Sequence, residues 1–247
     1  KLNFNVDISP KVKFSTSNSV SHQYQDAFLE RSAYFEGARS SIFFLSPFNQ
    51  PYNDDGTINQ FGGSLPNTLY ISKYNIDDNK LARITSTNKI SWDIGHGFDF
   101  STRYSIDYQV YNQRSYSNRN YGYGAATSGD ASQYVRHNVT NTIQNQLNYN
   151  FSLGEDHKFN TSLIQEYQTN ERYFVGGYGT NFADDGLFNL DSTGSPVSIN
   201  SSVYDYFVGA YLATFHYSAF NSKYIVNANY RYEGNSRFHP KQRWGSF

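Results

Sequence analysis

The stretch FDFSTRYSIDYQVYNQ, residues 98–113, alternates apolar and polar side chains along most of its length. Successive side chains of an extended chain point to opposite faces, so two different faces are expected here. One face would carry Phe98, Phe100, Thr102, Tyr104, Ile106, Tyr108 and Val110, and the other Asp99, Ser101, Arg103, Ser105, Asp107 and Gln109. The stretch therefore predicts a β-strand that separates two unlike surroundings.

The same alternation recurs along the chain and predicts about eight strands. Besides residues 98–113, it occurs in 1–8, 11–20, 88–94, 138–153 and 223–233, and less regularly in 157–168. The stretch 204–217 has apolar residues on both faces, so its register stays open. The chain is predicted to be all-β.

Short and long connections alternate between these strands. Short ones are predicted at 9–10, 95–97, 154–157 and 219–221, and long ones at 25–80, 113–136, 170–202 and after Glu233. This order predicts an up-and-down meander with every long loop at one end, which is typical of outer-membrane barrels. A soluble β-sandwich would not require that asymmetry.

The composition narrows the class of protein. The chain has 247 residues, a net charge of −1, 23 Tyr, 20 Phe and no Cys or Met, and its mean hydropathy is −0.68. This charge gives no basic field for nucleic acid, and the lack of cysteine excludes disulfides, cysteine-ligated zinc and a thiol nucleophile. The sequence has no apolar run of about 20 residues, so no transmembrane helix is predicted.

The two faces of the strands favour a membrane barrel. An aromatic outer face suits the girdles where a barrel meets lipid headgroups, and the polar face suits a wet lumen. Turning Arg103 into lipid would cost about 2–4 kcal/mol at the midplane, so the register should be firmly set. Residues 1–247 are expected to form part of one transmembrane barrel domain.

Local motifs predict turns rather than chemistry. Asp-Asp-Gly occurs in 52–59 and 182–189, where turn formation is favoured over a calcium site because neither copy has the full calcium-loop spacing. The six histidines are scattered, and no nucleophile elbow, phosphate loop or zinc motif occurs. We therefore expect no catalytic residue, no metal and no cofactor. A helix is expected over 26–37, capped by Asp26 and ended by Gly37.

The most specific signal is VNANYRYEGNSRFHPKQRWGSF, residues 226–247. It resembles a recurrent segment of SusC/RagA-family TonB-dependent outer-membrane transporters, in which a tyrosine-rich strand leads into a Gly-Ser-Ser-Arg-Phe turn and then Arg-Trp-Gly. The matching residues are Arg231, Glu233, Gly234, Ser236, Arg237, Phe238, Arg243, Trp244, Gly245 and Phe247. Asn235 stands where the family usually has Ser. The stretches 46–59 and 97–108 are similar to other family segments.

This resemblance implies a 22-stranded barrel filled by an N-terminal plug, an extracellular SusD-like lipoprotein lid, and energy supplied by TonB. It implies import of oligosaccharides or peptides across the outer membrane of a Bacteroidetes-type bacterium. The sequence contains no plug and about eight strands, so we expect an open mid-barrel segment. The candidates for lumen-facing, substrate-contacting residues are Arg103, Asp107, Gln144, Asn148, Asn227, Asn229 and Arg231.

Two alternatives remain open at this point. One is a complete eight-stranded structural or adhesive outer-membrane barrel, and the other a soluble carbohydrate-binding sandwich. A closed barrel would pair residues 2–8 with 224–232, whereas a segment would hold them far apart. The first long loop carries the apolar run IFFLSPF, residues 42–48, without strand alternation. Such a surface needs covering, and the resemblance implies the lipoprotein as its cover.

Overall fold

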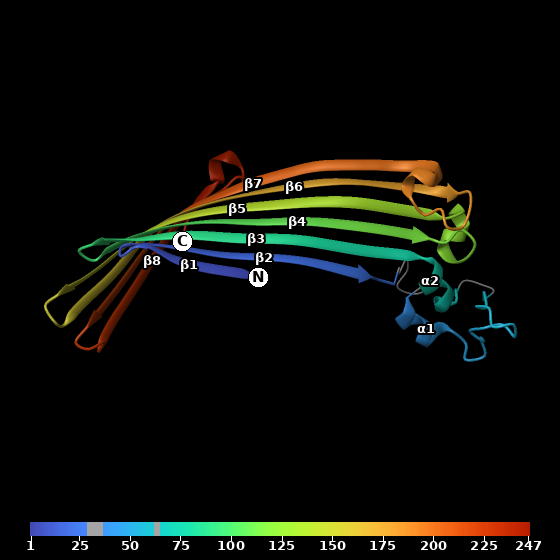
Figure 1. Ribbon diagram of the computed structural model, residues 1–247, viewed down its shortest axis with the longest axis horizontal. Helices are drawn as coiled ribbons and strands as arrows, with labels where there is room; N and C mark the ends of the chain where they lie inside the picture. The colour runs from blue at the N-terminus through green and yellow to red at the C-terminus, as the bar shows by residue number, and fades with distance from the viewer. Residues whose placement is uncertain (29–36, 62–64) are drawn as a thin grey trace.

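The computed structural model describes residues 1–28, 37–61 and 65–247 and consists of one antiparallel sheet (Figure 1). Its nine strands pair in sequence order. They are β1 (Leu2–Ser9), β2 (Val12–Asp26), β3 (Ile76–Gly95), β4 (Phe98–Ser117), β5 (Asp130–Leu153), β6 (His157–Phe182), β7 (Thr193–Ala219), β8 (Tyr224–Asn235) and β9 (Trp244–Ser246). The predicted all-β, up-and-down meander is confirmed, with β9 as an additional short strand.

The helices are short and lie in the connections. They are α1 (Ala38–Phe44), α2 (Thr68–Tyr74) and the 3₁₀ helices η1 (Gly122–Thr127), η2 (Leu190–Ser192) and η3 (Pro240–Gln242). Within the described ranges, no helix combines the length and the hydropathy needed to cross a membrane.

The helix expected over 26–37 is not placed as predicted. Asp26 pairs with Asp78 as the last residue of β2, because the strand continues to that point. Gly37 adopts an extended conformation as the N-cap of α1, so it precedes a helix instead of ending one. Residues 29–36 of the prediction lie outside the described residues.

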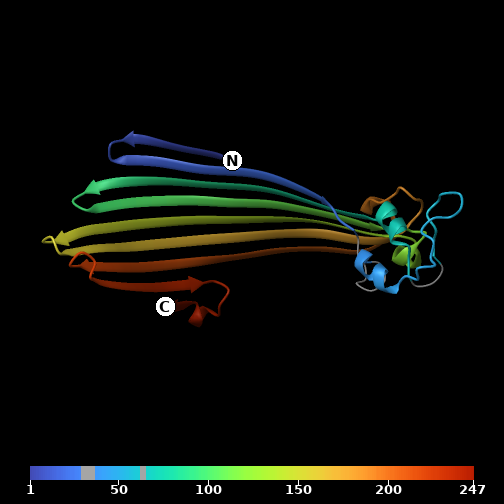
Figure 2. The same ribbon diagram turned by 90° about the horizontal axis from the view of Figure 1, so that it is seen from below.

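The short turns lie at one end of the sheet, and the connections β2–β3, β4–β5 and β6–β7 lie at the other, as predicted (Figure 1). The connection after β8, predicted as a fourth long one, is a turn of eight residues, 236–243, that does not reach that end (Figure 2). The long connections at 118–129 and 183–192 are shorter than expected, because the strands continue into the predicted loops. Side chains of β5 and β6 pack together in this added part of the sheet: the ring centroids of Tyr134 and Phe174 are 5.9 Å apart. We call the two ends of the sheet the turn end and the loop end.

The strands are much longer than a bilayer requires. β6 has 26 residues, which corresponds to about 86 Å of extended chain, whereas a barrel strand crosses a membrane with about 10 residues. β8 has 12 residues and turns back well short of the loop end (Figure 2). There the backbone N–H of Ser236 donates to the carbonyl oxygen of Phe207.

The sheet is open. Among the described strands, β1 pairs with β2 alone and β8 with β7 and β9, so the two edges do not meet. The alternative of a closed eight-stranded barrel is therefore wrong, and a single sheet is not a sandwich. The accessible surface is 15946 Å², against about 11,200 Å² for a compact monomer of this mass. The sheet leaves apolar surface that its own side chains do not cover.

The buried core is small and lies at the loop end. Tyr116, Ala131 and Phe182 are almost fully buried and pack against Ile76, Phe188 and Leu190. The rings of Tyr116 and Phe182 meet edge to face with centroids 5.2 Å apart. This cluster packs the long connections against the sheet, whereas most large apolar side chains elsewhere on the sheet are exposed or half-buried.

Candidate functional site: the two faces of the sheet

The strand register separates an apolar face from a polar face. Phe98 stands opposite Tyr149, and Phe100 stands between Trp92 and Leu147. We call the side of the sheet that carries these residues the apolar face. Its members on β4 are Phe98, Phe100, Thr102, Tyr104, Ile106, Tyr108 and Val110, which is the set that the alternation predicts to share a face.

A ladder of aromatic rings crosses the apolar face near the turn end. Phe98 stacks on Tyr149 with ring centroids 4.0 Å apart, and Tyr149 stacks on Phe151 at 4.8 Å. The ladder continues from Phe151 to Phe159 at 4.6 Å and from Phe159 to Tyr217 at 4.9 Å. Such a row of rings is typical of the interface between a barrel and lipid headgroups.

Charge returns to the apolar face only towards the loop end. On β6 and β7 the first carboxylates after the ladder are Glu171 and Asp205, which stand directly opposite each other. The positions between them and the ladder on that face, such as Leu163, Tyr167 and Tyr211, are uncharged. The apolar face therefore has an uncharged band bounded on one side by rings and on the other by acids.

All seven predicted lumen residues lie on the polar face, in two groups. Four of them occupy neighbouring strands β4 and β5: Arg103 stands opposite Gln144, Asp107 opposite Thr140, and Asn148 opposite Asp99. The other three, Asn227, Asn229 and Arg231, lie on β8, with β6 and β7 between the groups. The structure thus does not bring the seven together into a single site.

Several of these side chains are already occupied by neighbours. Arg83 binds Asp107 with two hydrogen bonds of 2.6 and 2.9 Å, and Arg231 pairs with Glu233 and, at 3.7 Å, with Glu166. The amide of Asn148 donates to Asp99 at 2.6 Å, and His216 and Asn227 are 2.6 Å apart. On this face, several charged and polar side chains therefore pair with one another.

The sequence prediction missed the aromatic residues on the polar face. Near the loop end this face carries Tyr111, Tyr134, Phe174, Tyr204 and Tyr206. Tyr134 and Phe174 were missed because their strands were expected to end before them, and Tyr204 and Tyr206 because the register of 204–217 was open. Tyr111 lies within 98–113, where the period of two places it on the polar face. Arg114 stands at an apolar-face position of the quoted strand, so the alternation gave no signal for the longer strands.

The family-like motif at 231–247 builds the hairpin between β8 and β9. The ring of Trp244 lies against Gly234 and stacks on Tyr232 with centroids 5.0 Å apart. The backbone groups of Phe247 exchange hydrogen bonds of 2.8 and 3.0 Å with those of Arg231. Gly245 stands opposite Glu233. These motif residues therefore have a structural role in the hairpin.

The turn of this hairpin is held by the remaining motif residues. The hydroxyl oxygen of Ser236 accepts from the backbone N–H of Phe207 at 3.0 Å, and Arg243 Nε donates to the carbonyl oxygen of Phe238 at 3.2 Å. The guanidinium of Arg237 lies over the ring of Tyr206, 4.3 Å from its centroid. Tyr206 belongs to the polar face, so the contact between Arg237 and Tyr206 lies there.

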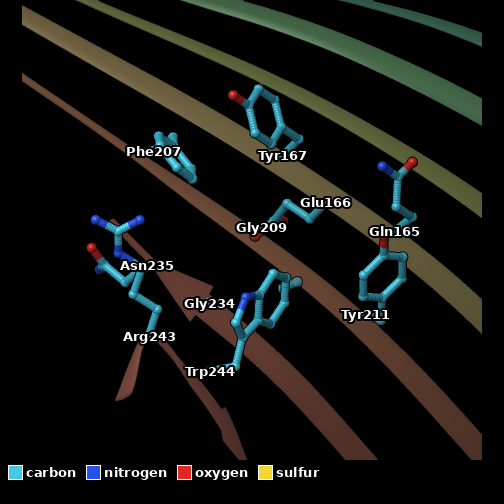
Figure 3. A pocket seen from close by; sticks show the side chains of 11 residues that line it. Gln165, Glu166, Tyr167, Phe207, Gly209, Tyr211, Gly234, Asn235, Arg243 and Trp244 are labelled. Atoms are coloured by element: carbon cyan, nitrogen blue, oxygen red, sulfur yellow. The ribbon is translucent and has the colours of Figure 1, made fainter. Parts of the chain in front are cut away.

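Beside the hairpin, the apolar face is hollowed over two glycines. Gly209 and Gly234 stand opposite each other and leave a hollow of about 340 Å³. Figure 3 shows Tyr167, Tyr211 and Trp244 around it, with Arg243 at one side. Four aromatic residues, Tyr167, Phe207, Tyr211 and Trp244, are part of its lining.

Both Asp-Asp-Gly stretches form turns, as predicted. Asp55 accepts hydrogen bonds from the hydroxyl and the backbone N–H of Thr57, which hold the pKa of Asp55 below its usual value. Gly56 and Gly186 have φ values of +80° and +90°, which suit glycine. In the part of the chain that the structure describes, no three His, Cys, Asp or Glu side chains are grouped to hold a metal ion.

No protein-family model matches this sequence, and no curated protein matches it. Solved structures do share its fold. The RagAB peptide transporter superposes with a TM-score of 0.83 at 17% identity over 99% of this chain. The RagAB peptide importer in its open-open and closed-closed states gives TM-scores of 0.84 and 0.81, both at 18% identity over 99% of this chain. The chain spans 28% of the length of each of these neighbours.

Proposed function

We propose that this chain is part of the barrel wall of a TonB-dependent transporter that imports peptides or oligosaccharides across a bacterial outer membrane. The observation that carries the proposal is the open sheet with one uncharged aromatic face and one polar face. Lipid would cover the apolar face, and the polar face would line the lumen. The fold shared with the RagAB structures supports this arrangement.

The open edges of the sheet support a wall segment over a self-contained barrel. The outer edge of β1 and that of β9 have no partner strand among the described residues. In hydrocarbon, each unpaired backbone N–H or C=O costs several kcal/mol, so an open sheet is not stable there. Further strands of the same barrel would pair both edges. The plug, and with it the contact to TonB, would belong to parts of the protein outside residues 1–247.

A surface lipoprotein of the SusD type is the proposed partner. The connection between β2 and β3 exposes Ile42, Phe43 and Phe44 on α1, and Phe48 after it, with 79%, 81%, 53% and 90% of their surfaces accessible. Apolar side chains exposed together in this way mark a contact surface. They lie at the loop end, where an extracellular lid would sit (Figure 1). The structural neighbours are peptide transporters, which favours peptide as substrate and leaves oligosaccharide as the alternative.

Uptake in living cells tests the proposal. Cells that carry the complete protein should accumulate a labelled peptide or oligosaccharide mixture, and a clean deletion should abolish that accumulation. Deletion of TonB, or an uncoupler, should stop uptake while leaving binding at the cell surface intact. Uptake that persists without TonB would contradict the energy source. A denatured subunit mass near 28 kDa, the mass of residues 1–247 alone, would contradict the wall-segment reading.

A further inference from the structure

Two arginines without acidic partners lie side by side on the polar face near the loop end. Arg136 on β5 stands opposite Phe174 on β6, and Arg172 stands opposite Asn138, so the two arginines are diagonal neighbours. Diagonal positions on paired strands are about 7–8 Å apart. Both side chains are exposed, and neither forms an ion pair with any described residue.

The acids of the polar face are too far away to neutralise this pair. Asp107 and Asp77 are each level with a position four residues from Tyr111, the residue opposite Arg136. Arg172 is level with Gln109, so Asp107 lies two strands and two residues away from it, at about 12 Å. Four residues of extended chain measure about 13 Å, which exceeds the Debye length of about 8 Å at physiological salt. Asp107 is also held by Arg83. Among the residues that the structure describes, none therefore compensates the positive charge of Arg136 and Arg172.

A third guanidinium extends the pair into a line. Arg237, from the hairpin turn after β8, lies over the ring of Tyr206 on β7. Tyr206 stands opposite Asn170, and Tyr204 opposite Arg172, with the two tyrosine rings 6.1 Å apart. Each step of this diagonal crosses one strand spacing of about 4.8 Å and two residues of about 3.3 Å each, so it measures about 8 Å.

Aromatic rings accompany all three charges. Arg136 lies over Tyr111 at 5.9 Å, Arg172 is level with Tyr204, and Arg237 covers Tyr206. A guanidinium offers a planar fork that binds a carboxylate through two hydrogen bonds, and stacking on a ring holds that fork in place. The whole line from Arg136 to Tyr206 measures about 16 Å, the length of about five residues of extended peptide.

We infer that this arginine–tyrosine diagonal, formed by Arg136, Arg172 and Arg237 with Tyr111, Tyr204 and Tyr206, binds an extended acidic peptide. This inference rests on the proposed import function, and it names the substrate class. Alternate residues of an extended peptide point to the same side about 6.7 Å apart, which is close to the step of the diagonal. The side chains of a peptide with Asp or Glu at every second position would meet successive guanidiniums. Its carboxylates would supply the missing negative charge.

A peptide pair that differs only in charge tests the inference. The complete transporter with its lipoprotein, purified in detergent, is titrated with a fluorescent pentapeptide that has Asp at positions 1, 3 and 5, and with its Asn counterpart. We expect the Asp peptide to bind at least tenfold more tightly, because hydrogen bonds to charged groups are the strong ones. The double variant Arg136→Gln/Arg172→Gln should bring the two affinities within about threefold of each other.

Lys80→Gln is the matched control. Lys80 is a cation on β3, one position from the level of Tyr111 but on the opposite, apolar face, so its loss should leave the preference for the Asp peptide unchanged. A second double variant, Arg136→Lys/Arg172→Lys, keeps the charge without the fork and should retain part of the preference. It separates lost recognition from misfolding of the Gln variant.

Three results would overturn the inference. Equal affinities of the wild type for the two peptides would do so while leaving the import function standing, since binding itself is detected. If the Gln double variant still prefers the Asp peptide, that preference arises in another part of the protein. The third result is a competition: an acidic oligosaccharide such as oligogalacturonate displaces the Asp peptide at a lower concentration than unlabelled peptide does. It would assign the diagonal to sugars. Failure of the proposed function would differ from all three: neither peptide would bind, and cells would accumulate neither.

Discussion

The indole ring of Trp244 occupies the space that a side chain at Gly234 would need. A Cβ built on Gly234 would lie 2.5 Å from two atoms of that ring. Gly234→Ala should therefore displace Trp244 and destabilise the β8–β9 hairpin by about 1–3 kcal/mol, the usual cost of overpacking. The free energy of unfolding in lipid vesicles, followed by tryptophan fluorescence, measures the effect.

Gly209→Ala provides the control for that substitution. A Cβ on Gly209 would approach Trp244 only to 3.6 Å, which is ordinary contact. We expect its effect on the unfolding free energy to stay below about 1 kcal/mol. Equal effects of the two substitutions would show that Trp244 is not held against Gly234.

The orientation of the two faces can be tested with adjacent residues of β6. Leu163 lies in the uncharged band of the apolar face and is 62% exposed, whereas Ile164 points to the polar face. Leu163→Arg should cost about 2–4 kcal/mol of folding free energy in a bilayer, because it places a cation in lipid. Ile164→Arg should cost much less. The yield of folded protein in vesicles gives the comparison, and a larger loss for Ile164→Arg would reverse the faces.

The turn between β3 and β4 depends on Gly97 for two reasons. Its φ is +83°, and a Cβ there would lie 2.1 Å from the carbonyl oxygen of Asn150. Gly97→Ala should lower the unfolding free energy by about 2–4 kcal/mol, from the left-handed backbone together with the clash. Gly154 has a φ of +66°, and a Cβ there would meet no such contact. Gly154→Ala should therefore lower the unfolding free energy by only about 1–2 kcal/mol. Similar losses in the two variants would mean that the β4–β5 backbone yields to the added methyl group.

Stability at the loop end should depend on pH through Asp78. Burial alone would raise the pKa of Asp78, but hydrogen bonds from Tyr24 and Arg114 and the charge of Arg114 outweigh it and lower the pKa. The resulting stability is fully present above the unfolded pKa of about 4, and it is lost as the pH falls through the lower folded pKa. Amide hydrogen exchange near residues 78 and 114 should therefore quicken at acid pH.

Asp78→Asn should remove that acid dependence, since the amide does not titrate in this range. Asp7→Asn is the control, because the pair of Asp7 with Lys13 has both side chains at least 70% exposed and contributes little. Exchange at the loop end that responds to pH equally in the wild type and in Asp78→Asn would assign the dependence to other groups.

The proposed lid contact predicts a loss of the partner. Phe43→Asp combined with Phe48→Asp would place two charges on the surface formed by α1 and the residues after it. The amount of lipoprotein that co-purifies with the complete protein should fall at least tenfold, because charges are disfavoured at the core of an interface. Leu2→Asp changes another exposed apolar residue, 67% accessible, on the edge strand β1. Loss of the lipoprotein in that control as well would point to misfolding.

Alternation was sufficient to predict the sheet because each strand meets unlike surroundings on its two sides. The quoted strand shows this directly: Phe98 and Arg103 fall on opposite faces, as the period of two requires. Three of the four short turns were predictable from glycine or proline next to polar residues, and the turn at 219–221 has neither. The register of 204–217 was not, because Ala210 and Leu212 of the polar face are as apolar as their neighbours on the other face.

The candidate site was predicted less completely than the sheet. Periodicity assigns Arg103 and Arg231 to one face. It does not reveal that Glu166 on β6 pairs with Arg231, which lies two strands away on β8. Nor does it bring together Arg136 and Arg172, which are 36 positions apart in the chain and become neighbours only through the β5–β6 register. Contacts across strands depend on registers that no single strand encodes.

The height of the uncharged band determines the bilayer thickness that this wall would fit. From Tyr217 to Phe207 the chain of β7 advances ten residues, or about 33 Å, and at a strand tilt of about 40° the rise along the membrane normal is about 25 Å. The bacterial outer membrane is thinner than average, and the ~25 Å rise fits it without hydrophobic mismatch. In a bilayer of longer acyl chains, the acids Glu171 and Asp205 would be drawn towards hydrocarbon. Lipids around the wall would then have to compress, and the cost would be a fraction of a kcal/mol for each ångström of mismatch.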